Sequence, residues 1–269
     1  MRVTVVYVLV ACAISWIVWW PLASQGGAAP DSPLRYLHLV GGLGPALAGI
    51  LAVWRFDGRP GLKRLLARVW RWRVAPRWHA IAWLSPLVLL GTAALVVRVA
   101  TSDMEPVRID RNAEYPRLPM ALYWACSLLA YGFGEEIGWR GVLLPRLQAR
   151  FGALASTLIV SLAWAGWHLP LFWFAPGMSR MGGVEMVGWY ASLLTGSLLF
   201  TWLFNATGGS VFVVAVFHGA MDIAFLATGP RLLPIVLGGL ITTWGAAVLL
   251  GYWFGRLNRQ PMVVDPSSS

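Results

Sequence analysis

Residues 3–20 read VTVVYVLVACAISWIVWW, a run of eighteen residues without a charged side chain. Because an α-helix rises about 1.5 Å per residue, such a run nearly crosses a hydrocarbon core of about 30 Å. The run is long for the apolar part of a signal peptide, and it ends in Trp19-Trp20, a pair typical of the membrane interface. We therefore predict a retained membrane helix, although Pro21-Leu22-Ala23-Ser24 loosely imitates a cleavage region.

The rest of the chain is similarly apolar. Of its 269 residues, 58% are hydrophobic and only 12% are charged, with a mean hydropathy of +0.66. A soluble domain would need far more charge to cover its core, so we predict that lipid is the solvent. We expect an all-α polytopic membrane bundle of about eight transmembrane helices, in contact with the lipid bilayer. The predicted spans are 3–20, 37–54, 79–99, 118–149, 153–174, 186–204, 211–228 and 232–254.

The chain shows no internal repeat of the solenoid or inverted-transporter kind. We therefore predict a single transmembrane domain over 1–259, followed by a short polar tail over 260–269. Small residues let membrane helices approach closely, and we expect this packing role at Gly238-Gly239. The same role is expected for Gly41, Gly42, Gly44, Ala48 and Gly49.

The charges between the spans predict the orientation. Segment 55–77 holds eight basic residues and one acid, Asp57, whereas segment 100–117 is balanced. The positive-inside rule makes 55–77 cytoplasmic and, by alternation, places Arg146/Arg150, Arg256/Arg259 and both termini there too. We expect the membrane to be a bacterial inner membrane. No nucleic-acid partner is predicted, because the basic residues lie in gaps between apolar runs and form no single basic face.

Three predicted spans carry ionisable residues. Residues 131–140 read YGFGEEIGWR, which places Glu135, Glu136 and Arg140 inside the fourth span. The fifth and seventh spans add His168, His218 and Asp222. Charge inside a bilayer is costly, so these residues are candidates for a functional site.

Helix geometry predicts that these residues meet. The fourth and fifth spans form an antiparallel hairpin with a turn expected at Phe151-Gly152, midway between Glu135 and His168. Both side chains then lie at the same depth, about 24 Å along the helices from that turn. His218 and Asp222 are four residues apart and share one helix face, about 12–18 Å from their own cytoplasmic turn.

Structural interpretations compete at several positions. Glu136 and Arg140 have the i,i+4 spacing of an intrahelical ion pair, which favours a structural role, whereas Glu135 has no obvious partner on its helix. We expect His38 and His79 to be interfacial, at span ends without an acidic neighbour. Arg180 and Glu185 are expected in a solvated outer loop.

The candidates form three motifs: Glu135-Glu136-x-x-x-Arg140, an aromatic residue four positions before His168, and His218-x-x-x-Asp222. Together they resemble the CAAX-protease and bacteriocin-processing family of intramembrane endopeptidases, which includes the Ras-converting CAAX prenyl endopeptidase. Each motif alone is weak, but the three together are fairly specific. The resemblance covers about 118–228, with a fainter echo over 44–49.

The resemblance implies a role for each candidate. Glu135 is the implied general base, which activates a water together with His168, while His218 and Asp222 stabilise an oxyanion. Glu136 and Arg140 are then supporting residues. The cofactor is left open: a divalent metal such as zinc, held by Glu135, His168, His218 and Asp222, is the alternative to glutamate-dependent chemistry.

Two positions depart from the family pattern. Trp164 stands where the second motif normally opens with Phe, and Asp222 stands where the third often ends in Asn. A carboxyl group can donate to an oxyanion only when it is protonated. Otherwise Asp222 would orient His218 or complete a metal site.

The predicted function is therefore that of a CAAX-type intramembrane endopeptidase, a peptide hydrolase acting on a membrane-associated peptide or protein, lipidated or not. One alternative is a proton-coupled transporter, because Glu, His and Asp chains also relay protons in membranes. Against it stand the missing repeat and the charges at one depth. The other alternative is a non-catalytic membrane scaffold or immunity-type peptide-binding protein.

Overall fold

The computed structural model describes residues 2–29, 31–110, 112, 114–255, 257 and 261–265. Over these residues the chain is helical, and its β contact is an isolated bridge between Arg108 and Thr228. The all-α prediction is confirmed. The elements are α1 (Arg2–Ala23), η1 (Pro33–Tyr36), α2 (Leu37–Gly42), α3 (Gly44–Val69), α4 (Pro76–Thr101), α5 (Met120–Cys126), η2 (Ser127–Phe133), α6 (Gly134–Gly138), η3 (Trp139–Leu143), α7 (Leu144–Trp167), α8 (Leu171–Phe174), α9 (Gly183–Ala206), α10 (Val211–Phe225) and α11 (Leu233–Trp253).

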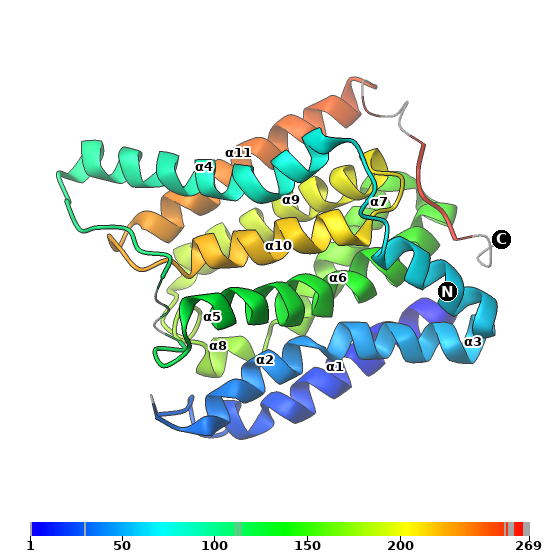
Figure 1. The fold of residues 1–269 in the computed structure, drawn as a ribbon, viewed down its shortest axis with the longest axis horizontal. Coiled ribbons are helices and arrows are strands. Elements are labelled where there is room, and N and C mark those ends of the chain that lie inside the picture. Colours follow the sequence, from blue (N-terminus) through cyan, green and yellow to red (C-terminus); the bar gives the residue numbers. More distant parts are fainter. Residues whose placement is uncertain are drawn as a thin grey trace.

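Six helical segments in the described part of the chain are long and apolar enough to cross a membrane. One of them, Met120–Phe174, contains two crossings, because Gly152 adopts φ 72° and ψ 178° and interrupts the helix. Figure 1 shows the chain running out along α5 and α6 and returning along α7 to α8. With this returning leg and the shorter apolar helix α10, the described bundle is consistent with the predicted number of about eight spans. The chain is an integral membrane protein.

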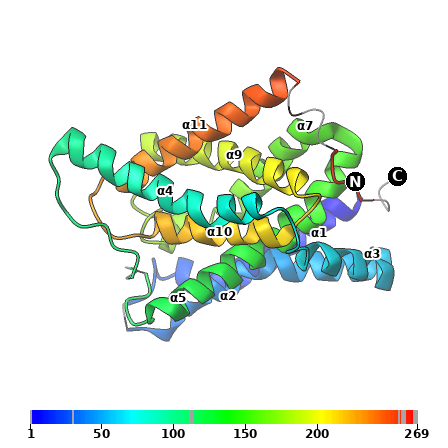
Figure 2. The ribbon, with the colours of Figure 1, turned by 45° about the horizontal axis from the view of Figure 1, so that its top comes forward.

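Helix α10 lies at the centre of the bundle. It packs against α4 and against η2, while α9 packs against α7 and α11. Figures 1 and 2 both show α10 between α4 and the leg formed by α5 and α6. Every residue from Val213 to Met221 is buried, so the polar side chains of this helix must find partners inside the protein.

The leg that carries the two glutamates is irregular. π-helical turns η2 and η3 flank α6, and such turns are frequent at functional sites. A Cβ atom on Gly132 would lie 2.3 Å from Ala215 O of α10, and one on Gly138 would lie 2.4 Å from Pro45 O of α3. A larger residue than glycine would collide with the facing backbone at either position, so the segment from η2 to η3 packs tightly between α10 and α3.

The predicted close packing of small residues is present on the α2–α3 side. A Cβ on Gly41 would lie 2.0 Å from Trp19 Nε1. At Gly238-Gly239 the approach is looser: a Cβ on Gly238 would make ordinary contact with Ser192 at 3.6 Å, and Gly239 has no atom within 4 Å. Helix α11 instead approaches α9 through Gly245, whose Cβ would lie 2.4 Å from Thr195 O.

Several predicted boundaries differ from the structure. The span predicted to end at 54 continues as α3 to Val69 across a break at Gly58, so part of the basic segment is helical. Pro145 lies in the first turn of α7, directly after η3, and the carbonyl of Gly141, four residues before it, accepts a hydrogen bond from Arg68 Nη1 (3.0 Å). Glu185 does not lie in a loop, because its carboxylate accepts a hydrogen bond from Gly182 N (2.7 Å) in the first turn of α9.

Three segments far apart in the sequence meet at one end of the bundle. Arg146 forms ion pairs with Asp57 and with Asp265 (3.5 Å), and Arg68 Nη1 lies 3.7 Å from Asp265. Helix α1 begins at this end, where segment 261–265 also lies (Figure 1). Arg256 and Arg259 lie outside the described residues. The boundary between domain and tail at 259 stays a prediction.

Candidate active site

The candidate residues come from three elements. Helix α6 supplies Glu135 and Glu136, which are 3% and 0% exposed, and α10 supplies His218 and Asp222. His168 directly follows the last residue of α7. The fold thus brings together residues separated by more than 80 positions in the sequence.

Glu136 is the centre of a buried ionic cluster. Its Oε1 accepts hydrogen bonds from Arg140 Nη1 (2.7 Å) and from His218 Nδ1 (2.9 Å). Arg140 also donates to Ser197 Oγ (3.0 Å), and its side chain is fully buried, like that of Glu136. The predicted ion pair is present, and Glu136 in addition orients a candidate histidine.

His218 and Asp222 share one helix face, as predicted. Because Nδ1 of His218 donates to Glu136, Nε2 is the nitrogen that faces Asp222, at 3.6 Å from Oδ2. This separation is too long for a hydrogen bond. Asp222 Oδ2 is buried and makes no hydrogen bond in the described structure. Both polar atoms are therefore free to interact with a bound molecule.

Trp164 links the other two candidates. Its Nε1 donates to Glu135 Oε2 (2.6 Å), and its backbone carbonyl accepts from His168 Nδ1 (2.7 Å). Since a carbonyl oxygen only accepts, Nδ1 of His168 carries a proton and Nε2 of the neutral ring holds the lone pair. Glu135 and His168 both contact Trp164, and no hydrogen bond or ion pair joins them directly in the described structure.

The hydrogen bonds of the candidate histidines leave one ring nitrogen of each available. His218 and His168 each use Nδ1 in a hydrogen bond, as metal-binding histidines also do, and one oxygen of Glu135 accepts from Trp164. In the part of the chain that the structure describes, no three His, Cys, Asp or Glu side chains converge in a way that could hold a metal ion. Glu135 and His168 both bind Trp164, and His218 binds Glu136, so the four residues form no common ligand set in the described structure.

A second buried polar cluster was not predicted. His38 is not interfacial: it is 8% exposed and pairs with Glu114 through Nδ1. Tyr115 donates to Glu114 Oε1 (3.2 Å) and contacts the hydroxyl of Tyr131 (2.9 Å), which lies one turn before Glu135. Burial, reinforced by the charge of Glu114, raises the pKa of Tyr115 well above its ordinary value, so its phenol stays a donor. The cluster anchors the outer segment between α4 and α5 to the bundle.

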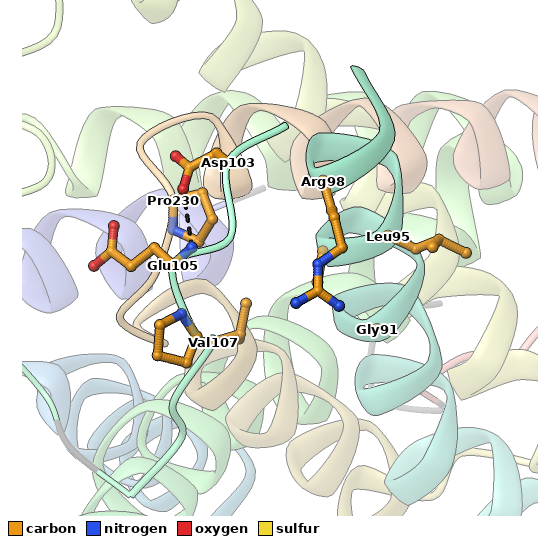
Figure 3. Close-up of a pocket in the computed structure, with 9 residues that line it drawn as sticks. Gly91, Leu95, Arg98, Asp103, Glu105, Val107 and Pro230 are labelled. Carbon is orange, nitrogen blue, oxygen red and sulfur yellow. Dashed lines mark hydrogen bonds between the residues drawn. The ribbon is translucent and has the colours of Figure 1, made fainter. Parts of the chain in front are cut away.

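Two cavities lie away from these residues. One, of about 260 Å³, lies between α4 and the outer segment, with Arg98, Asp103 and Glu105 among its lining residues (Figure 3). Another, of about 360 Å³, is lined by residues from 25–29 and 174–180. Neither lining includes a candidate residue.

Comparison with known sequences bears on the segment that holds the site. Residues 117–224 match the sequence model of a family described as Type II CAAX prenyl endopeptidase Rce1-like. A curated relative, "CAAX prenyl protease 2" of Methanococcus maripaludis, is 29% identical over 96 residues. The alignment covers 34% of this chain and 35% of the relative, about a third of each. The family resemblance based on the three motifs is confirmed, and the matched segment contains all six candidate residues.

Proposed function

Since residues 117–224 belong to the Rce1-like CAAX prenyl endopeptidase family, we propose that this membrane protein hydrolyses a peptide bond at the site around Glu135. The observation that carries the proposal is the contrast between two adjacent glutamates. Arg140 and His218 neutralise Glu136, whereas no Arg, Lys or His in the described structure forms an ion pair with Glu135. A buried carboxylate without a cationic partner is costly, and such groups mark sites of chemistry.

The proposed reaction uses Glu135 as the general base. Trp164 occupies Oε2, so Oε1 takes a proton from water while the water oxygen attacks the carbonyl carbon of the substrate. The lone pair on His168 Nε2 accepts a hydrogen bond from the same water and orients it. When the C–N bond breaks, the proton passes from Glu135 to the leaving amine nitrogen, which balances the reaction.

His218 and Asp222 are proposed to bind the carbonyl oxygen as it becomes negative. Nε2 of His218 and Oδ2 of Asp222 are the unused atoms of this pair. Because Nδ1 of His218 already donates to Glu136, Nε2 donates to the oxyanion in the imidazolium form of the ring, and a protonated Asp222 would donate alongside it. Glu136 and Arg140 are positioning residues. They hold the imidazole of His218 from its other nitrogen, while Arg140 neutralises the charge of Glu136.

The proposed chemistry depends on glutamate and routes no step through a metal. The scheme needs only Glu135 and His168 to activate the water, and among the described residues no three His, Cys, Asp or Glu side chains converge on one point. We expect cleavage to continue after dialysis against EDTA or 1,10-phenanthroline. Elemental analysis of the active protein should find far less than one zinc per chain, and proportional recovery of activity with added zinc would contradict the expectation.

The proposed substrate is a membrane-associated peptide or protein, and the proposed location is a bacterial inner membrane with both termini in the cytoplasm. The substrate class follows from the family, whose description names prenyl endopeptidases. The orientation is supported by the basic segment 55–77, which lies at the same end of the bundle as the start of α1 (Figure 1).

The test is cleavage of a fluorogenic peptide library, with and without a prenyl group, by purified protein in detergent. Wild type should cleave, and Glu135→Gln and His168→Ala should lose about 100-fold or more in kcat while keeping the wild-type melting temperature. Two other outcomes would overturn the proposal. Peptide binding without cleavage favours the scaffold, and proton-driven uptake into liposomes that Glu135→Gln abolishes favours the transporter.

A further inference from the structure

We propose that Trp164 is a positioning residue that fixes the carboxylate of Glu135 for catalysis through its indole N–H. The inference rests on the proposed function, and it gives a purpose to the one aromatic position where this chain departs from the family's Phe. A phenylalanine fills similar space but has no hydrogen to donate. Tryptophan in place of phenylalanine therefore adds a hydrogen-bond donor that can orient the carboxylate of Glu135, the proposed base.

The contacts of Trp164 are unusual for a packing residue. Its indole Nε1 donates to Glu135 Oε2 at 2.6 Å, and its backbone carbonyl oxygen accepts a hydrogen bond from His168 Nδ1 at 2.7 Å. The indole is 7% exposed. A hydrogen bond to a carboxylate in a buried site is stronger than one in water, because water does not compete for either partner.

The ring itself is held on several sides. The guanidinium of Arg140 lies 4.9 Å from its centre, and the rings of His218 and Phe200 lie 5.4 Å and 5.7 Å away. Arg140 and His218 are in turn bound to Glu136. The indole N–H therefore has little freedom to leave Glu135 Oε2, which leaves Oε1 as the oxygen for the proposed proton transfer.

Substitution by phenylalanine separates the two contacts of Trp164. Trp164→Phe removes the N–H to Glu135 but keeps the backbone carbonyl that binds His168. Trp139→Phe is the matched control, because Trp139 is buried like Trp164 and its Nε1 has no hydrogen-bond partner among the described residues. Both variants lose the same atoms from a buried indole, and only one loses a contact with the base.

The kinetic test compares these two variants on a cleaved peptide. Trp164→Phe should lower kcat about 10- to 100-fold with KM nearly unchanged, the range that loss of a charge-assisted hydrogen bond gives. Trp139→Phe should keep the wild-type kcat. Equal kcat values in the two variants would overturn the positioning role, while loss of cleavage in Glu135→Gln would still support the proposed function.

Thermal unfolding tests the same contact without any substrate. In an otherwise wild-type protein, Trp164→Phe should lower the melting temperature more than it does in a Glu135→Met background, which has no acceptor. Trp139→Phe should lower it equally in both backgrounds. If Trp164→Phe also lowers the melting temperature equally in the two backgrounds, the hydrogen bond to Glu135 contributes nothing to stability. The proposal then fails, whether or not the protein cleaves peptides.

Discussion

Arg140 illustrates at the residue scale how a charge is stabilised inside this bundle. Its guanidinium donates to Glu136 and Ser197 and lies against the rings of Trp164 and Phe200, at 4.9 and 4.6 Å. The pairing with Glu136 could be predicted from the four-residue spacing alone. The contact between Glu136 and His218 could not, because it joins residues 82 positions apart and depends on how α10 packs.

Removal of this guanidinium should be strongly destabilising. Arg140→Met leaves Glu136 charged, buried and bound only to His218, and breaking a buried ion pair on one side costs about 3–5 kcal/mol. We expect a large fall in the free energy of unfolding, measured by denaturant titration in detergent. Arg140→Met combined with Glu136→Gln should recover part of the loss. Wild-type stability of the single variant would contradict the structural role of the pair.

At the element scale, the irregular leg from η2 to η3 determines where the two glutamates lie. Regular helix geometry predicts the depth of Glu135 and the turn at Gly152, but not the π-helical turns on either side of α6. Nor does it predict that Trp164 lies between Glu135 and His168. Both depend on side-chain packing across helices, which a pattern along one helix does not contain.

The glycines of this leg should be intolerant of a methyl group. Gly138→Ala would place a Cβ 2.3 Å from Tyr7 Oη and 2.4 Å from Pro45 O, so α3 must move away. Such overpacking costs about 1–3 kcal/mol, and we expect a lower melting temperature. Gly166→Ala in α7 is the control, since nothing lies within 4 Å of its added Cβ. Equal melting temperatures for the two variants would argue against this tight packing.

The outer segment between α4 and α5 should depend on its buried carboxylate. Glu114 binds His38 and Tyr115, so Glu114→Ala removes an anchor shared with the bundle. We expect trypsin to cut faster after Arg108 or Arg117, as followed by mass spectrometry.

The control for this cleavage is an exposed ion pair of the same region. Asp31→Asn removes the partner of Arg117, but both side chains are more than 60% exposed and such a pair contributes little. Cleavage should therefore stay at the wild-type rate in Asp31→Asn. Accelerated cleavage in this variant, or none in Glu114→Ala, would show that the buried pair is not the anchor.

At the scale of the whole molecule, composition and apolar runs were sufficient to predict an all-α membrane bundle. Charge in the membrane was sufficient to find the six candidates. What the sequence did not contain was contact between distant segments. His38 had no acidic neighbour in the sequence, yet Glu114, 76 positions away, lies against it. Asp57 and Asp265 likewise meet Arg146 only in the folded chain.

The proposed orientation predicts which side of the membrane each segment faces. A single cysteine in place of Arg73, in a background with Cys12 and Cys126 changed to Ala, should react with an impermeant maleimide only in inside-out vesicles. A cysteine in place of Glu105 should react only in vesicles of the opposite orientation. The reverse labelling pattern would invert the topology, and with it the side from which substrate reaches Glu135.

The central claim is that water attached to Glu135 cleaves a peptide bond inside this bundle. The most direct measurement is peptide cleavage in H₂¹⁸O by the reconstituted wild type and by folded Glu135→Gln. The masses of the cleavage products are determined by mass spectrometry. Wild type should release a new carboxylate carrying one ¹⁸O atom, and Glu135→Gln should release at least about 100-fold less. Cleavage by Glu135→Gln at the wild-type rate, or none by folded wild type on any peptide, would contradict the account.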